Sequence, residues 1–267
     1  GEGEGYPVAM INSENNSIEK IDINVILGMI GIYYTLIAAW DEENKANWDE
    51  WLKEADIVVP DSASTQHGMD EYGLEFLESY FKRTRKNKQG YRMNTGFWDE
   101  GDVSQSIMGE TDTVKIEAFM RERLATLIKL RPTEINVVQE PFDLIEGKFV
   151  WAKTPWYNAF GEDWTVKAFQ FANEEAEKQG VNPGKDIKFY WNDWKLDQPS
   201  AKLDLTLTLI DKITQAGSHI DGVGLQIYNG TQNKYYPHVP NKDELIEVMR
   251  TLKEHVPHIY AEYETYR

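Results

Sequence analysis

Short runs of apolar, β-branched and aromatic residues alternate along the chain with longer runs whose apolar positions recur every three or four residues. Short runs of this kind predict strands, and the longer periodic runs predict amphipathic helices. Their alternation is typical of βα units, in which strands pair in parallel because each helix returns the chain to the same edge. The clearest strands begin at Ile57, Tyr91, Ile135, Ile187, Val223 and His258. We interpret them as apolar on both faces, as parallel strands are when helices cover them.

Helices are predicted in the intervals between these strands. They cover residues 71–88, 113–130, 162–179, 201–216 and 242–254. The last of them keeps the three- and four-residue spacing of an amphipathic helix at Leu245, Val248, Met249 and Leu252. Gly180 and Gly217 follow two of the periodic runs, where a glycine commonly ends a helix.

The number of strands indicates a closed barrel. A seventh strand is predicted from Ile32, and the segment YPVAMIN, from Tyr6, could supply an eighth. We therefore predict one α/β domain over residues 1–267, folded as a (β/α)8 barrel. An open barrel would leave two unpaired strand edges. Two alternatives remain for the last strand: residues 8–11 pair with residues 259–262, or the barrel is truncated at its C-terminus.

The run from Ile23 to Ala39 is nearly all apolar. A membrane span needs about 17 or more such residues, so the length is close to that minimum. The run also contains Asn24, Gly28 and Gly31 and lacks basic flanks. We interpret it as a buried helix followed by a buried strand.

Composition limits the range of partners. The chain has 267 residues, 41% of them hydrophobic, which is enough for a sizeable core. Its net charge of −17 repels nucleic acid and anionic lipid, whereas an uncharged polymer would tolerate such a surface. Because there is no cysteine, disulfides, thiolate metal sites and thiol nucleophiles are excluded. The start, GEGEG, does not resemble a signal peptide; we expect a mature, secreted monomer that binds neither nucleic acid nor membrane.

Polar residues gather where the predicted strands end, which in an α/β barrel is where active sites lie. They are Asn94, Trp98, Glu140, Asn192, Asp193, Gln226, Tyr228, Glu262 and Glu264. Cleaving a glycosidic bond requires one carboxylic acid to protonate the leaving oxygen and one carboxylate for the anomeric carbon. Aromatic faces stack on sugar rings, and amides and hydroxyls bind sugar hydroxyls. Two carboxylates among tryptophans and tyrosines therefore indicate carbohydrate chemistry.

Five segments, in matching order and spacing, are similar to motifs of glycoside hydrolase family 10, the xylanase family. INVVQEPFD resembles the strand W-D-V-V-N-E-A, which carries the family's acid/base. TPWYNAFGEDWTVKAFQFANE resembles S-x-W-Y-x-x-x-G-E-D-Y-I-x-x-A-F-x-x-A, and IKFYWNDWKLD resembles K-L-Y-Y-N-D-Y-N-L-E. HIDGVGLQIY resembles P-I-D-G-I-G-L-Q-S-H, and HIYAEYE resembles V-x-I-T-E-L-D. The resemblance covers the chain from about Tyr72 to Arg267.

The resemblance implies a mechanism and a substrate class. Glu140 matches the general acid/base and Glu262 the nucleophile, which implies net retention of anomeric configuration. In retaining enzymes the two carboxyl groups lie about 5–5.5 Å apart. The implied substrate is a β-1,4-linked plant polysaccharide such as xylan, and no cofactor is needed. The residues expected to contact it are Asn94, Trp98, Gln139, Trp191, Asn192, Trp194, Gln226, Tyr228 and Glu264.

Several of these positions depart from the family pattern. Gln139 stands where the family has the asparagine that addresses the sugar 2-hydroxyl. Asn94, Asp99 and Tyr228 each replace a histidine. Two further functions therefore stay open: a carbohydrate-binding protein on a degenerate hydrolase barrel, or a hydrolase of a different glycan.

Some assignments have structural alternatives. Glu264 lies two residues after Glu262 on the same face of the strand and is a rival nucleophile. We favour Glu262 facing inward, because an unpaired carboxylate on the helix-packed face would be costly. Of Trp191 and Trp194, one is expected to serve as a sugar platform and the other to pack in the core. The H-x-x-H spacing of residues 255–258 could bind a metal, but no third ligand is evident nearby, and we expect none.

Overall fold

The computed structural model describes residues 28–30, 56–229 and 240–265. The predicted strand from Ile32 and the proposed pairing partner at residues 8–11 lie outside this part of the chain. Within the long apolar run, Gly28–Ile30 is a strand that pairs in parallel with the next one, rather than helix. In the described part of the chain, none of the helices is long and apolar enough to cross a membrane.

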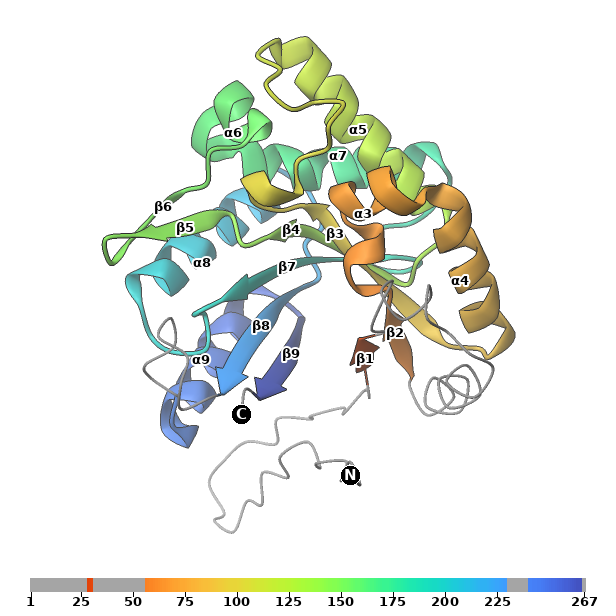
Figure 1. Cartoon of the computed structure of the whole chain (residues 1–267). Coiled ribbons are helices and arrows are strands. Elements are labelled where there is room, and N and C mark those ends of the chain that lie inside the picture. Colours follow the sequence, from red (N-terminus) through yellow and green to blue (C-terminus); the bar gives the residue numbers. More distant parts are fainter. Residues whose placement is uncertain (1–27, 31–55, 230–239, 266–267) are drawn as a thin grey trace.

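In the described part of the chain, seven parallel strands form one curled sheet, in which strand order follows chain order (Figure 1). They are β1 (Gly28–Ile30), β2 (Ile57–Val59), β3 (Gly90–Phe97), β4 (Glu134–Gln139), β7 (Lys188–Trp194), β8 (Gly222–Asn229) and β9 (His258–Thr265). All six clear strand predictions are confirmed, because each apolar run is long enough for a strand and too short for a helix.

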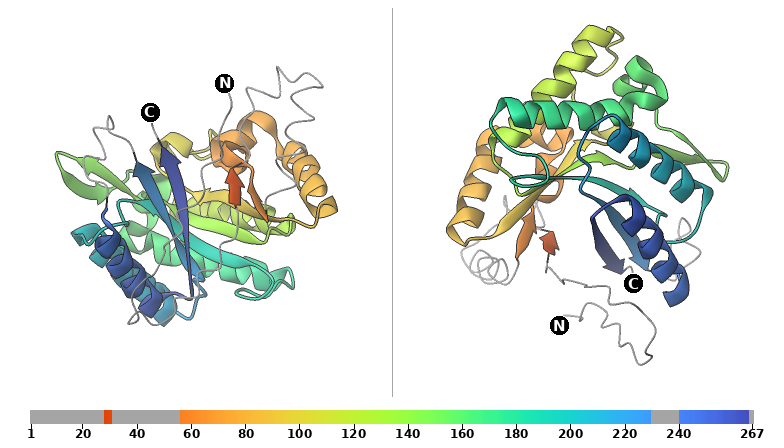
Figure 2. Two further views of the ribbon diagram at one scale, coloured as in Figure 1. Left: turned by 90° about the horizontal axis from the view of Figure 1, so that it is seen from below. Right: turned by 180° about the vertical axis from the view of Figure 1, so that it is seen from behind.

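The helices lie outside the curl of this sheet (Figure 2). They are α3 (Gln66–Tyr72), α4 (Leu74–Lys86), α5 (Thr113–Lys129), α6 (Pro155–Phe160), α7 (Trp164–Lys178), α8 (Ala201–Gln215) and α9 (Lys242–His255), with short 3-10 turns at Asp61–Ser64, Glu100–Asp102 and Gly161–Asp163. The helix predicted over about 71–88 is confirmed as α4, but it begins at Leu74. Gly73 adopts φ 77° and ψ 167° and separates α4 from the preceding helix α3, which was not predicted.

A hairpin after β4 was not predicted from the sequence. It consists of β5 (Phe142–Ile145) and β6 (Lys148–Trp151), antiparallel to each other, and projects beyond the main sheet (Figure 1). Glu146 and Gly147 form its tip, both with positive φ (50° and 77°), as a two-residue hairpin turn requires. The hairpin is attached through Phe149, whose ring meets that of Trp194 edge-on at 5.9 Å.

The interpretation of the strands as apolar on both faces is wrong. Their outer faces are apolar and buried in the helix-covered core, as Ile135, Phe189 and Val223 illustrate. Their inner faces carry the polar set Arg92, Asn94, Glu134, Asn136, Asn192, Tyr260 and Glu262. Helices cover only the outside of a curled sheet, so inward side chains meet one another and can satisfy their own hydrogen bonds.

An ion pair and two tyrosine rings fill this interior near the N-terminal ends of the strands. The Arg92 Nη2 lies 2.7 Å from Glu134 Oε2, and both side chains are largely buried. Tyr190 packs edge-on against Tyr260 with 5.2 Å between ring centroids. The glycines of β8 provide the space that these two rings occupy. A Cβ at Gly222 would overlap the Tyr190 ring and lie 2.5 Å from the His258 carbonyl oxygen.

We predict that Gly222→Ala lowers the free energy of unfolding by about 1–3 kcal/mol, the usual cost of overpacking. The added methyl group would press on the backbone of the neighbouring strand, which cannot rotate away as a side chain can. Urea unfolding followed by tryptophan fluorescence measures the change. Gly101→Ala is the control, because its Cβ would approach only a side-chain oxygen of Asp99, at 3.1 Å. Equal stability of the two variants would contradict the prediction.

Candidate active site

Glu140 lies where the chain leaves β4 and turns toward the hairpin. It adopts φ 45°, which is uncommon for a residue with a side chain, and its amide donates to the Asn192 carbonyl oxygen at 3.0 Å. Asn192 is also the residue of β7 paired with Gln139. Pairing of β4 with β7 therefore fixes the backbone from which the Glu140 side chain projects.

The environment of Glu140 favours its protonated form. The side chain is partly buried, and burial is the main cause that raises its pKa to about 7, with the Asp193 charge adding to it. Hydrogen bonds from Gln226 and Trp98 and the charge of Lys202 act in the opposite direction. The Trp98 Nε1 donates to Glu140 Oε2 at 3.1 Å. Glu140 can therefore hold a proton near neutral pH and still release it.

A buried ion pair lies on the outer side of β7, beneath this carboxyl group. Lys202 Nζ is 2.7 Å from Asp193 Oδ1, and neither side chain is exposed. Lys202 also donates to the Trp194 carbonyl at 2.6 Å and lies under the Phe149 ring, 4.9 Å from its centroid. Sequence reasoning missed this pair. The available signal was a lysine within the buried stripe of α8, seven residues before Leu209.

Asn192 links Glu262, the second predicted acid, to Glu140. Its Nδ2 donates to Glu262 Oε1 at 2.9 Å, and its Oδ1 accepts from Gln226 Nε2 at 2.5 Å. Gln226 of β8 is also the residue paired with Glu262 of β9. The structure therefore brings Glu140, Glu262, Asn192 and Gln226 together from four strands, with Glu262 facing the interior. The separation of about 5–5.5 Å between the two carboxyl groups stays a prediction.

The remaining predicted substrate contacts fall into different surroundings. Gln139 is only 4% exposed, and its Oε1 has no hydrogen-bond partner among the described residues. Asn94 Oδ1 accepts from Asn136 Nδ2 at 3.0 Å. Tyr228 and Glu264 are paired residues of β8 and β9, but their side chains lie outside the described part of the chain, so the rival role of Glu264 is not tested.

The two tryptophans of β7 have separate roles. Trp191 is fully buried, with its Nε1 3.4 Å from Asp193 Oδ2 and its ring 6.5 Å from that of Phe142. It therefore belongs to the core. Trp194 is half-buried at the end of the strand, where its ring contacts Phe149. Of the two, only Trp194 has an accessible surface for a sugar ring.

The histidine pair does not share a ligand. His255 Nδ1 lies 2.6 Å from Asp211 Oδ1 and so links α9 to α8. His258 begins β9. Within residues 28–30, 56–229 and 240–265, no group of three or more histidine, aspartate or glutamate side chains is placed to hold a metal ion.

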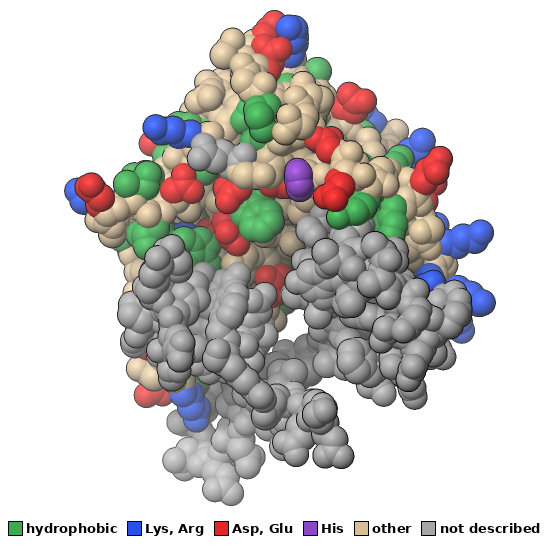
Figure 3. Space-filling view, viewed as in Figure 1, with side chains coloured by type: hydrophobic (Ala, Val, Ile, Leu, Met, Phe, Trp, Pro, Cys, Tyr) green, Lys and Arg blue, Asp and Glu red, His purple; other side chains and the backbone are tan. Residues whose placement is uncertain are grey.

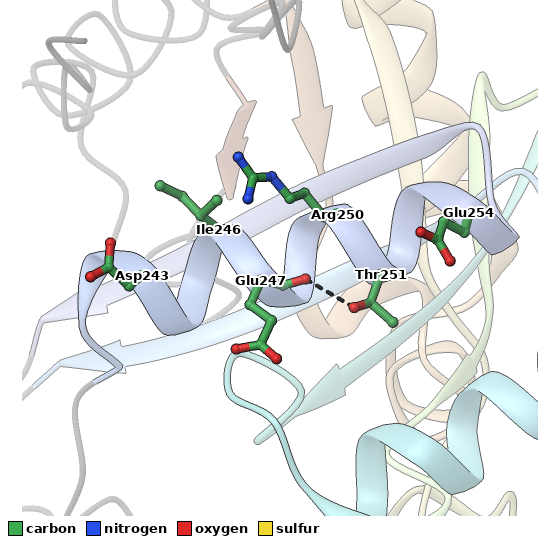
Figure 4. A pocket seen from close by; sticks show the side chains of 6 residues that line it. All are labelled: Asp243, Ile246, Glu247, Arg250, Thr251 and Glu254. Carbon is green, nitrogen blue, oxygen red and sulfur yellow. Dashed lines mark hydrogen bonds between the residues drawn. The ribbon is translucent and has the colours of Figure 1, made fainter. Parts of the chain in front are cut away.

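A surface depression on α9 is separate from the carboxylates. Its lining residues all come from this one helix (Figure 4): Asp243, Ile246, Glu247, Arg250, Thr251 and Glu254. Over the described part of the face in Figure 3, acidic side chains are interspersed with hydrophobic ones, as the net charge of −17 would lead one to expect.

Residues 38–256 match the family model described as glycosyl hydrolase family 10. The chain belongs to this family. Among curated proteins, this family member is 29% identical over 187 residues to endo-1,4-beta-xylanase A of Halalkalibacterium halodurans, covering 63% of this chain and 44% of that protein. It is 22% identical over 173 residues to endo-1,4-beta-xylanase 1 of Humicola insolens, covering 63% of this chain and 38% of that one. The family 10 chain thus spans less than half the length of these two relatives.

Solved structures of family 10 confirm the predicted (β/α)8 fold class. The native xylanase 10B from Thermotoga maritima superposes with a TM-score of 0.70 at 16% identity, covering 90% of this chain and 69% of that chain. Native xylanase 10C from Cellvibrio japonicus gives 0.72 at 14% identity, covering 90% and 50%. At such identities the likeness shows the fold alone.

We predict that Trp98→Phe raises the pKa of Glu140 further above its value of about 7. The substitution removes a hydrogen bond that favours the ionised carboxylate. A hydrogen bond to a charged group contributes about 1.5 kcal/mol, so the expected change is roughly 1 pH unit. Carbon NMR titration of glutamate-labelled protein measures it without any assay of activity. A pKa that stays the same or falls would show that the indole N–H does not set the charge of Glu140.

We predict that Glu140→Gln stabilises the protein at pH 8 by about 1–3 kcal/mol and much less at pH 4. Between the ordinary glutamate pKa of 4.5 and about 7, the folded protein keeps a proton that the unfolded chain has released. Stability of the unmodified protein therefore falls as pH rises through this window, and glutamine removes that loss. Urea unfolding at both pH values measures the effect. The exposed Glu177→Gln is the control, and an equal gain in both variants would contradict the assignment.

Proposed function

We propose that this protein is a retaining glycoside hydrolase that cleaves β-1,4-linked plant polysaccharide, with xylan as its substrate. The observation that carries the proposal is that one residue, Asn192, binds two glutamates whose carboxyl groups have unlike surroundings. Glu140 has a pKa raised to about 7, whereas Glu262 accepts a hydrogen bond from Asn192, which also binds the Glu140 backbone. An acid and a carboxylate held together are what glycosidic cleavage requires.

In the first step, Glu140 gives its proton to the glycosidic oxygen as the bond from that oxygen to the anomeric carbon breaks. Glu262 attacks the anomeric carbon from the opposite face and forms a covalent glycosyl–enzyme ester. The leaving sugar departs with the proton, and Glu140 becomes a carboxylate. The Asn192 amide donates to Glu262 Oε1 and holds this side chain in position for the attack.

In the second step, the Glu140 carboxylate takes a proton from water. The resulting hydroxide equivalent attacks the anomeric carbon, and the bond to Glu262 breaks. Two inversions give net retention, and both residues return to their starting charges. The pKa of about 7 suits this exchange, because the group must be a useful acid in one step and a useful base in the next.

The choice of substrate is supported by the relatives and by the aromatic surface. Curated relatives of the chain are named endo-1,4-beta-xylanases. Trp98 and Trp194 are partly exposed near the acids and offer faces for sugar rings. Xylan cannot enter a cell as a polymer, so the proposal includes secretion, and the net charge of −17 presents no obstacle to a neutral glycan.

Because Gln139 and Asn94 depart from the family pattern, two alternative functions are examined by the same activity test. A carbohydrate-binding protein would retain the aromatic faces but would not turn over any glycan. A hydrolase of another glycan would show the same two-acid chemistry on a different polymer. The raised pKa of Glu140 favours an enzyme, since strongly shifted pKa values cluster at catalytic sites, where an acid must hold and release a proton near the working pH.

We predict that Glu140→Ala and Glu262→Ala each lower kcat/KM on xylan by at least about 10²–10⁴-fold, the usual range for a positioned acid or base. Reducing-sugar release from xylan and mixed β-glucans, together with hydrolysis of aryl xylobiosides, measures the loss. Azide should restore turnover of the aryl glycoside in both variants. Glu262→Ala should give the α-glycosyl azide, and Glu140→Ala the β-glycosyl azide, because azide replaces the nucleophile in one and the attacking water in the other.

The control is Glu146→Ala, at the exposed tip of the hairpin, which should keep the activity of the unmodified protein. Binding to a glycan without turnover on every substrate would support the binding-protein alternative. Retained activity in Glu262→Ala would remove the assignment of the nucleophile, and release of the α anomer as the first product would rule out the retaining mechanism.

A further inference from the structure

Tyr260 connects two distant strands across the interior of the curled sheet. It belongs to β9, yet its hydroxyl donates to Asn136 Oδ1 of β4 at 2.7 Å. Two further strands, β7 and β8, lie between these in the sheet. Asn136 in turn donates through Nδ2 to Asn94 Oδ1 of β3, at 3.0 Å. The phenol thus has one defined direction of donation, toward β4 and β3.

The same hydroxyl accepts a hydrogen bond from Asn192 Nδ2. Asn192 therefore has no freedom in its side chain: its Oδ1 accepts from Gln226, one amide proton goes to Tyr260, and the other goes to Glu262 Oε1 at 2.9 Å. Asn192 itself is fully buried. If the phenol hydroxyl were removed, one amide proton would lose its acceptor, and the amide could rotate away from Glu262.

The surroundings of Tyr260 fix its ring. The guanidinium carbon of Arg92 lies 3.4 Å from the ring centroid, and Arg92 is itself held by Glu134. The ring also lies so close to Gly224 that a Cβ there would overlap it. Burial, with the Glu262 charge, raises the pKa of Tyr260 well above its ordinary value, so the hydroxyl keeps its proton.

We propose that Tyr260 is a positioning residue that holds Asn192, and through it the nucleophile Glu262, in the orientation needed for attack on the sugar. This inference rests on the proposed hydrolase function. The hydroxyl provides the acceptor, whereas the ring, held by its contacts with Arg92 and Gly224, provides the fixed point. Fixing a nucleophile in this way matters because a displacement of about 1 Å can lower a rate by about 10²-fold.

The test is Tyr260→Phe, which keeps the ring and its stacking on Arg92 and removes only the hydroxyl. We expect kcat for an activated aryl xylobioside to fall about 10–100-fold with little change in KM. We also expect the acidic limb of the kcat/KM profile to move to higher pH, because Glu262 would lose a fixed donor to its ionised form. The rate of covalent trapping by a 2-deoxy-2-fluoro glycoside should fall in parallel.

Tyr190→Phe is the matched control. It removes a hydroxyl from the same interior layer, but that hydroxyl bonds with Glu134 and not with Asn192. Arg92 and Glu134, the charged groups stacked beneath Tyr260, are the same in both variants. We expect Tyr190→Phe to lower the unfolding temperature without moving the acidic limb. A merely structural role for Tyr260 would give the same result in Tyr260→Phe and would overturn the proposal.

A second variant displaces the Tyr260 hydroxyl instead of removing it. Gly224→Ala keeps the hydroxyl group but displaces it together with the ring, because the added Cβ would overlap both, so it should also lower kcat and shift the acidic limb. If Tyr260→Phe and Gly224→Ala both show the same kinetics as the unmodified protein, the positioning role of Tyr260 is contradicted. The assignment of Glu262 as nucleophile would not be affected. Full activity of Glu262→Ala would instead end the proposed mechanism and the role of Tyr260 with it.

Discussion

The hydrogen bonds of Asn192 are the constraint on which this site depends. The backbone carbonyl of this residue binds the amide of Glu140, and its side-chain amide binds Glu262. One buried residue of β7 therefore sets the positions of two acids that lie 122 residues apart in the chain, from 140 to 262. The link is short because β4 and β7 are neighbours and because the sheet curls enough for β9 to face β7 from within.

Such an interior must satisfy its polar groups internally, because helices cover the outer face of the sheet alone. The inner face does so with an ion pair, Arg92–Glu134, and with a directed series of amide and hydroxyl groups above it. A second ion pair, Asp193–Lys202, is buried on the outer face against α8. Buried pairs of this kind contribute little to stability, since desolvation offsets their attraction, but they fix charge near a titrating group. Here the group is Glu140.

Residues around the two acids differ from the family motifs, although the acids themselves match them. In the quoted motifs an aspartate occupies the position of Asn136 and an isoleucine that of Tyr260. In this chain the acidic partner of Arg92 is Glu134, on the same strand as Asn136. Asn136 is then neutral and able to accept from the phenol. The departures at Asn94, Asn136 and Tyr260 therefore form one connected arrangement of hydrogen bonds rather than independent losses.

The sequence alone determined the succession of strands and helices, because apolar runs and three- and four-residue spacing report local burial directly. The family motifs likewise identified Glu140, Glu262, Asn192 and Gln226, since these residues stand in short segments whose spacing is readable. The break at Gly73, the hairpin and the burial of Trp191 were not readable, because each depends on backbone angles or on what packs against the residue. The polar interior was missed for the same reason. A strand's period distinguishes its two faces, but only the curl of the sheet decides that one faces helices and the other faces Tyr260, Arg92 and the acids.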